Sequence, residues 1–223
     1  MFIDYCNGSD VGALLKLRKT ITQLEVKAIL RQVVKACRDI WAINIIHRDI
    51  KLANVLLHFP NRPDLDTMDK KDKLNFLRTV NLAEVEFIAR LADFGLSTIH
   101  NPDRKGHQSI CGTPLYSAPQ LLRKNRYTYK VDVWALGIMT YEMLMGRTPF
   151  HSYEMRDLIA KINKGDYSVI LRQPITVECA LFLTQCLQAN EPDRLDVQML
   201  LDHPFLTGSC KADSLTDLDS KAY

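Results

Sequence analysis

The chain has 223 residues, 47% of them hydrophobic and 25% charged, with a formal net charge of +3. The length allows one domain or two, and this composition can bury a substantial core. Charges of both signs are interspersed without a polybasic arm, which argues against nucleic-acid binding and attachment to a membrane surface. The longest apolar stretch, 131–144, contains Asp132 and Glu142 and is shorter than the ~20 residues of a spanning helix. It therefore predicts a buried helix and no direct membrane insertion.

In chain order, residues 1–6 have the pattern of the end of a strand, and residues 7–10 that of a turn or helix cap. Residues 22–25, Thr-Gln-Leu-Glu, have capping-box spacing, and apolar residues then repeat at intervals of three and four. This pattern predicts a long amphipathic helix that ends near Ile43. Residues 55–57 then predict a short apolar strand.

A polar, charge-rich stretch occupies residues 58–86 and contains Pro60 and Pro63. Leu74 and Leu77 allow a helical turn or two, but we expect a solvated loop. Residues 88–92 predict a second strand, which leads into Asp93.

The second half of the chain predicts helices at 129–145, 153–163, 176–187 and 195–201, separated by glycine and proline. The first of these is apolar nearly all round, as expected for the central helix of a larger fold. The tail, residues 207–223, is polar and is expected to fray.

Six cysteines are scattered without a Cys-x-x-Cys pair, which argues against a zinc site. They predict a reduced, intracellular setting such as the cytoplasm. Cys37 and Cys186 fall on apolar helical faces and are expected in the core.

Two motifs carry the most information. Residues 47–54 have the sequence His-Arg-Asp-Ile-Lys-Leu-Ala-Asn, and residues 93–95 are Asp-Phe-Gly. Phosphoryl transfer needs a group that accepts the substrate hydroxyl proton, cations over the phosphates and ligands for the metal ions. A lone Asp-Phe-Gly is usually a turn beside a core aromatic, but here both motifs occur in order and Cys-Gly-Thr-Pro-Leu-Tyr-Ser-Ala-Pro follows at 111–119.

Together these motifs resemble the catalytic loop, metal-binding motif and substrate platform of the eukaryotic-type protein kinase family, serine/threonine branch. The implied fold is mainly α, the C-terminal lobe of the α+β protein-kinase-like fold, with short β-strands around the catalytic loop. We expect a partial kinase domain at 1–206, comprising the linker between lobes and the C-terminal lobe, with an insertion near 58–86 and a tail at 207–223. The 223 residues contain no glycine-rich phosphate loop, so we expect this chain alone to be an inactive fragment.

The resemblance implies ATP and Mg²⁺ as cofactors and a protein Ser or Thr hydroxyl as acceptor. Asp49 corresponds to the base, and Lys51 is expected to stabilise charge on the transferring phosphoryl group. Asn54 and Asp93 offer the oxygen ligands that suit Mg²⁺.

The same resemblance places the adenine of ATP against the first residues of the chain. Ile3 would lie at the back of the pocket, the backbone of Asp4 and Cys6 at the adenine edge, Asp10 at the ribose and Leu56 beneath the base. Taken alone, residues 1–10 fit an ordinary strand followed by a helix N-cap equally well, and Leu56 fits a generic core leucine.

Residues 93–119 correspond to an activation loop. Arg48 offers a bidentate fork for a phosphate on this loop. Ser109 is the favoured phosphorylation site, although other loop hydroxyls compete with it. Thr113 is expected to hydrogen-bond near Asp49 and Lys51.

Five further residues are assigned structural roles by the resemblance. Asp132 would hold the backbone of the catalytic loop from below, beside His47, and Phe94 would act as a packed position sensor. The family motif Ala-Pro-Glu is Ala-Pro-Gln here, ending at Gln120, while Arg194 resembles the arginine that usually pairs with that glutamate. A glutamine can hydrogen-bond an arginine but cannot form the charged pair.

Two functions remain open on the sequence. One is a Ser/Thr protein kinase domain, and the other is a non-catalytic module, derived from a kinase lobe, that docks substrates or partners. A small-molecule kinase is disfavoured by the substrate platform at 111–119.

Overall fold

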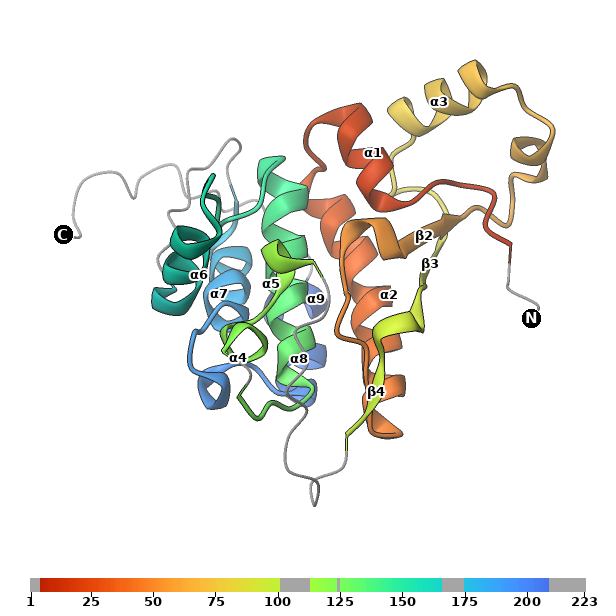
Figure 1. The fold of residues 1–223 in the computed structure, drawn as a ribbon. Coiled ribbons are helices and arrows are strands. Elements are labelled where there is room, and N and C mark those ends of the chain that lie inside the picture. Colours follow the sequence, from red (N-terminus) through yellow and green to blue (C-terminus); the bar gives the residue numbers. More distant parts are fainter. Residues whose placement is uncertain (1–4, 101–112, 124, 166–174, 209–223) are drawn as a thin grey trace.

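The computed structural model describes residues 5–100, 113–123, 125–165 and 175–208, and these are mostly helical (Figure 1). The predicted fold class is confirmed: helices dominate, and the short strands flank the catalytic loop. The helices of the described residues are α1 (Val11–Arg18), α2 (Gln23–Ala42), α3 (Lys70–Thr79), α4 (Pro119–Leu122), α5 (Lys130–Met145), α6 (Met155–Lys164), α7 (Val177–Cys186), α8 (Val197–Asp202) and α9 (Pro204–Thr207). Their strands are β1 (Ile45–Ile46), β2 (Val55–His58), β3 (Ile88–Leu91) and β4 (Thr98–Ile99).

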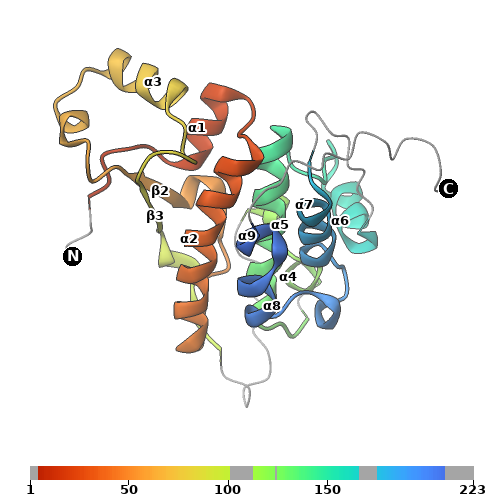
Figure 2. The same ribbon diagram turned by 180° about the vertical axis from the view of Figure 1, so that it is seen from behind.

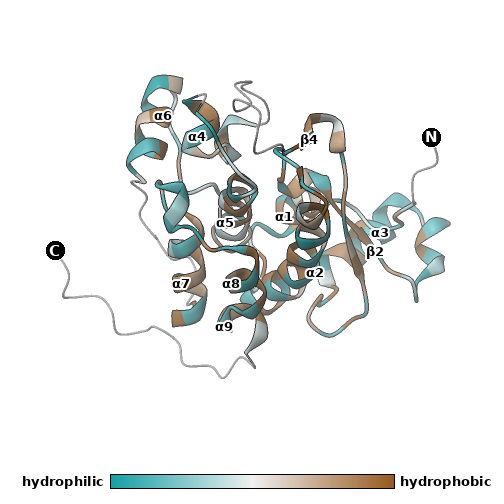
Figure 3. Ribbon diagram, turned by 90° about the horizontal axis from the view of Figure 1, so that it is seen from below, coloured by the Kyte–Doolittle hydropathy of each residue, from teal (hydrophilic) through white to brown (hydrophobic). Residues whose placement is uncertain are grey.

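Helix α2 begins and ends close to the predicted residues. The Thr22 side chain accepts the Glu25 N–H and the Glu25 carboxylate accepts the Thr22 N–H, which is the predicted capping box. Val26, Ile29 and Val33 are fully buried on one face. In Figure 3, α2 shows both a hydrophilic and a hydrophobic side, as expected for an amphipathic helix.

Helix α5 lies at the centre of the fold, between α2 on one side and α7 on the other (Figures 1 and 2). Nearly all of its side chains are buried, as its apolar sequence predicts. Gly137 permits close packing on α7, because an added Cβ would lie 2.7 Å from the Cys186 Cβ. Cys37 and Cys186 are both fully buried, which confirms their prediction as core residues.

Two antiparallel strand pairs frame the catalytic loop. In one, Val55 lies opposite Leu91 and His58 opposite Ile88, and in the other β1 pairs with β4. The predicted strands at 55–57 and 88–92 are therefore confirmed. The first pair brings the end of the catalytic loop beside the start of the Asp-Phe-Gly motif, because the Ala92 N–H donates to the Asn54 carbonyl at 2.8 Å.

The expectation of a solvated loop at 58–86 is wrong. This insertion contains a 3-10 turn at Pro63–Asp66 and the ten-residue helix α3, which the Asp69 side chain caps. Leu65, Leu77 and Leu82 are buried, so a few widely spaced apolar side chains anchor an otherwise polar segment. Composition concealed this arrangement because the polar residues between them face outward.

The remaining predictions concern the other helices and the two ends of the chain. Helices α1, α4 and α9 were not predicted, while α6, α7 and α8 lie within two residues of the predicted bounds. The strand predicted for residues 1–6 and the fraying tail lie almost wholly outside the described residues. In the described part of the chain, no helix is both long and apolar enough to cross a bilayer.

Candidate active site

One buried carboxylate, that of Asp132, binds the start of the loop at residues 47–54. Asp132, on the first turn of α5, is fully buried. Its Oδ2 accepts the His47 N–H at 2.9 Å and the Trp41 indole N–H at 2.9 Å, and its Oδ1 accepts the Arg48 N–H at 2.8 Å. Burial raises the pKa of Asp132, whereas these three hydrogen bonds oppose that rise by favouring the charged carboxylate.

These bonds hold an unusual backbone conformation in place. Arg48 has a φ of 67°, in the left-handed region that costs an L-residue roughly 1–2 kcal/mol. The loop therefore turns sharply at Arg48, directly before Asp49. The Arg48 side chain donates to the Leu96 carbonyl at 2.6 Å and to the Tyr127 hydroxyl at 3.0 Å.

His47 adopts one neutral tautomer on the basis of its partners. Nε2 lies 3.1 Å from the Ala92 carbonyl oxygen, which can only accept, and Nδ1 lies 3.3 Å from the Asp49 N–H, which can only donate. The hydrogen therefore belongs on Nε2. Burial lowers the pKa of His47 and favours this neutral form, although the charge of Asp132 and the hydrogen bond to Ala92 act in the opposite direction.

Asp49 is the point at which the loop side chains converge. Lys51 Nζ lies 2.6 Å from Asp49 Oδ2, and Asn54 Nδ2 donates to the same oxygen at 3.1 Å and to the Asp49 carbonyl at 2.8 Å. Thr113 Oγ1 lies 3.4 Å from both Asp49 Oδ1 and Lys51 Nζ. Three residues from two separate segments thus surround one carboxylate that is only 5% exposed.

The Asp-Phe-Gly segment is exposed and follows Ala92, whose N–H donates to the Asn54 carbonyl. Asp93 is exposed with a φ of 64°, a left-handed conformation that Asp tolerates better than most residues, and its side chain accepts the Gly95 N–H at 3.2 Å. A Cβ at Gly95 would lie 3.1 Å from Asp93 Oδ1, so the glycine makes room for the carboxylate. The Phe94 ring packs on His47 at a centroid distance of 4.8 Å, yet 43% of Phe94 remains exposed.

Two side chains, those of Asn54 and Asp93, have oxygen atoms that could bind a metal ion. Asn54 donates through its nitrogen, and within the described residues no hydrogen bond engages its Oδ1. The Asp93 carboxylate is exposed. An amide oxygen and a carboxylate suit Mg²⁺, which commonly binds through one or two protein ligands together with substrate phosphates. In the described segments, no group of three or more His, Cys, Asp or Glu side chains that could hold a metal ion occurs.

The residues predicted to face ATP are only partly described. Ile3 and Asp4 lie outside the described residues, as does Ser109. Asp10 caps α1, where its Oδ1 accepts the Ala13 N–H at 2.8 Å, and it forms a β-bridge with the partly buried Leu56. Cys6 is partly buried and lies just before this segment. Asp10 is therefore the N-cap of α1, and its expected contact with the ribose stays a prediction.

Comparison with known proteins decides the family. A model of the protein kinase domain matches residues 1–206. The chain belongs to the protein kinase family. Its curated relatives are serine/threonine kinases: PLK4 of Nematostella vectensis, 32% identical over 90% of this chain, polo of Drosophila melanogaster, 30% over 93%, and PLK1 of Xenopus laevis, 28% over 92%. The matched part covers 18%, 31% and 30% of those proteins, so the chain spans less than a third of their length.

Within this kinase-family chain, Gln120 and Arg194 do meet. Arg194 is 2% exposed, and its Nη2 donates to Gln120 Oε1 at 2.5 Å. The guanidinium also donates to the carbonyls of Gln188, Lys130 and Ala189 and lies over the Trp134 ring at 5.0 Å. Burial lowers the pKa of Arg194 to about 10.

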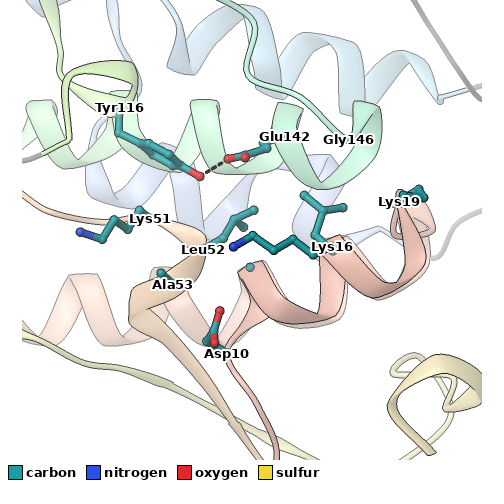
Figure 4. A pocket seen from close by; sticks show the side chains of 11 residues that line it. Asp10, Lys16, Lys19, Lys51, Leu52, Ala53, Tyr116, Glu142 and Gly146 are labelled. Carbon is teal, nitrogen blue, oxygen red and sulfur yellow. Dashed lines mark hydrogen bonds between the residues drawn. The ribbon is translucent and has the colours of Figure 1, made fainter. Parts of the chain in front are cut away.

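A cavity of about 370 Å³ adjoins the kinase catalytic loop on the α1 side (Figure 4). Lys51 lines its end near Asp49, and Lys16 extends across it from α1. Tyr116 donates a hydrogen bond to Glu142 on its α5 wall. Burial raises the pKa of both of these groups.

Several residues that shape this candidate site were not predicted from the sequence. The bond from Tyr116 to Glu142 joins the substrate platform to α5, and Tyr127 receives the Arg48 side chain. Asn7 is 2% exposed and connects the segment after Cys6 to the insertion. Tyr116 lies in the 111–119 motif, but the motif gives no sign of its bond to Glu142, and Asn7 and Tyr127 belong to no short motif, so only their partners in space reveal these roles.

Proposed function

We propose that the chain carries the catalytic loop of an ATP-dependent protein serine/threonine kinase, with the domain at residues 1–206. The observation that best supports this proposal is the convergence of Lys51, Asn54 and Thr113 on the Asp49 carboxylate. A carboxylate held in this way can orient a substrate hydroxyl, which is the main demand of phosphoryl transfer.

The two oxygens of Asp49 differ in their availability. Oδ2 is engaged by Lys51 and Asn54, whereas Oδ1 has one long contact with Thr113 among the described residues. In the proposed reaction, Oδ1 accepts the proton of the Ser or Thr hydroxyl. The substrate oxygen forms a bond to the γ-phosphorus of ATP as the bond from that phosphorus to the bridging oxygen of ADP breaks. Lys51 stabilises the charge on the transferring phosphoryl oxygens.

ATP and Mg²⁺ are the proposed cofactors. Asn54 Oδ1 and the Asp93 carboxylate would hold Mg²⁺, which when bound neutralises charge on the β- and γ-phosphates. Arg48 is proposed to bind a phosphate on the activation loop, with Ser109 as the favoured site. An intracellular, cytoplasmic location is proposed from the scattered spacing of the six cysteines in the sequence.

The proposed acceptor is a protein hydroxyl, and the test is direct. The chain is fused to a glycine-rich first lobe from one of its relatives and incubated with γ-labelled ATP, Mg²⁺ and casein. We expect labelled phosphoserine or phosphothreonine from the fusion and none from the 223 residues alone. If the fusion binds Mg²⁺-ATP but transfers no phosphate, the non-catalytic docking module is the better description.

A further inference from the structure

The insertion contacts the protein on both sides of Cys6, the residue whose backbone is proposed to face adenine. On one side, Asp66 of the insertion lies near the exposed Tyr5 and raises the pKa of its hydroxyl. On the other side, Asn7 is buried against residues 59–62 of the insertion. A segment that meets both neighbours of one residue can fix that residue's backbone.

Asn7 makes the more extensive of the two contacts. Its Nδ2 donates to the carbonyls of Phe59 and Arg62, both at 3.0 Å, and its Oδ1 accepts the Phe59 N–H at 2.8 Å. Three of the four hydrogen bonds available to an asparagine amide are thereby formed within the turn that opens the insertion. Since Asn7 is 2% exposed, water cannot replace these partners without a local opening.

The backbone N–H of Asn7 also determines the direction in which the Cys6 carbonyl points. Its N–H points toward His58 Nδ1 at 3.4 Å. In a planar trans peptide, the N–H and the preceding carbonyl point in opposite directions. The carbonyl of Cys6 must therefore point away from His58, and its orientation depends on how firmly Asn7 is held.

The far end of the insertion is anchored to the helices beneath it. Arg18 on α1 donates to the carbonyls of Leu77 and Val80, and it forms a buried ion pair with Glu25 at 2.7 Å. The Glu25 oxygen that pairs with Arg18, Oε1, also accepts the Leu82 N–H at 3.1 Å. The insertion is thus bonded at both ends, to Asn7 at its start and to Arg18 and Glu25 near its end. These contacts restrict the movement of the turn that binds Asn7.

We propose that the insertion, residues 58–86, braces the adenine-facing segment of the nucleotide site, and that Asn7 is the positioning residue through which it acts. This inference rests on the proposed function, because it assumes that ATP binds beside Cys6. It assigns the insertion a role in nucleotide affinity, in addition to its packing on α1.

The first test measures, in the absence of nucleotide, how firmly the insertion holds the segment around Cys6. Cys6 of the full 223-residue chain is alkylated with iodoacetamide, and the rate is followed by peptide mass spectrometry, with buried Cys37 and Cys186 as internal references. We expect Asn7→Ala to accelerate Cys6 alkylation about fivefold or more, since it removes three buried hydrogen bonds. Asn61→Ala is the matched control, because Asn61 is exposed and bonds only Glu86 within the insertion, among the described residues. A Cys6 rate in Asn7→Ala within twofold of wild type would overturn the proposal.

The second test measures the coupling to nucleotide. Binding of adenosine and of inorganic tripolyphosphate to the labelled chain is followed by NMR. Asn7→Ala is expected to weaken adenosine binding about fivefold or more while leaving tripolyphosphate binding within twofold. Equal weakening of both ligands, or of neither, contradicts a positioning role.

A milder variant keeps the proposal testable if the Asn7→Ala chain does not fold. His58→Phe removes only the acceptor for the Asn7 N–H and is expected to change Cys6 alkylation and adenosine binding in the same direction as Asn7→Ala. If the wild-type chain binds neither adenosine nor ATP, the proposed function fails and the nucleotide coupling fails with it. The alkylation rates then still decide whether the insertion braces Cys6.

Discussion

Arg194 donates to the amide oxygen of Gln120 at 2.5 Å, so a neutral side chain faces a guanidinium that is 2% exposed. Three backbone carbonyls complete its hydrogen bonds. The positive charge is therefore buried opposite dipoles, and its desolvation is not offset by a carboxylate at this position.

The substitution Gln120→Glu supplies that carboxylate. It loses the bond from Gln120 Nε2 to the Ala189 carbonyl. In return, the acceptor of the Arg194 guanidinium changes from a neutral amide to a carboxylate, so that an ion pair forms. We expect the free energy of unfolding in urea at pH 7 to rise by about 1 kcal/mol. Arg194 would hold the pKa of the new glutamate below its ordinary value, so this gain should be present above about pH 4.3 and fade on further acidification. A lower stability at pH 7 would contradict the account.

Arg18 and Glu25 form a buried ion pair, with side chains 10% and 5% exposed. Arg18→Ala leaves the Glu25 carboxylate buried without its cation and removes the donors to Leu77 and Val80. We expect a loss of about 3–5 kcal/mol in the free energy of unfolding. Arg38→Ala breaks the exposed pair with Asp39 and is expected to cost no more than about 0.5 kcal/mol. Similar losses in the two variants would rule out the proposed anchoring.

Asp132 accepts three N–H groups, and an asparagine can accept at only one of its two terminal atoms. Asp132→Asn should therefore destabilise the fold by about 2–4 kcal/mol in urea unfolding, since at least one buried donor loses its acceptor. Asp39→Asn is the exposed control and should change stability by less than about 0.5 kcal/mol. A neutral effect at Asp132 would show that the loop is held by other contacts.

The lowered pKa of His47 predicts a loss of stability in mild acid. A base whose folded pKa lies below its unfolded value of about 6.5 contributes stability that is complete above pH 6.5. That contribution is lost as the pH falls through the folded pKa, because protonating Nδ1 breaks the bond from the Asp49 N–H. The raised pKa of Asp132 acts in the opposite direction.

The measurement is the slope of unfolding free energy against pH between about 6.5 and 5. His47→Gln should flatten this slope, although the buried His203, whose pKa is also lowered by burial, leaves part of it. The exposed control His151→Gln should leave the slope unchanged. An equal slope in His47→Gln and wild type would exclude His47 as a contributor.

The sequence predicted the parts of this structure that depend on local pattern. The capping box at Thr22 and the apolar repeat of α2 determine that helix almost to the residue. Likewise, the uniform apolar character of α5 identified it as the central helix. These signals are short-range, so a single sequence contains them in full.

The insertion was mispredicted because its stability comes from partners far away in sequence. Leu77 and Leu82 are buried in the main hydrophobic core. Arg18 binds the carbonyls of Leu77 and Val80, which lie 59 and 62 positions further along the sequence. The roles of Asn7 and Tyr116 were hidden for the same reason. Tertiary contacts of this kind leave no periodic signal.

The central claim is that Asp49 serves the phosphoryl-transfer step. The most direct measurement compares kcat for casein phosphorylation by the chain fused to a first lobe, with Asp49→Asn against the exposed control Asp39→Asn. Asp49→Asn should lower kcat by about 100-fold or more, because the variant can no longer accept the hydroxyl proton, while ATP affinity stays within about threefold. Transfer at the wild-type rate in Asp49→Asn would contradict the assignment of the catalytic base.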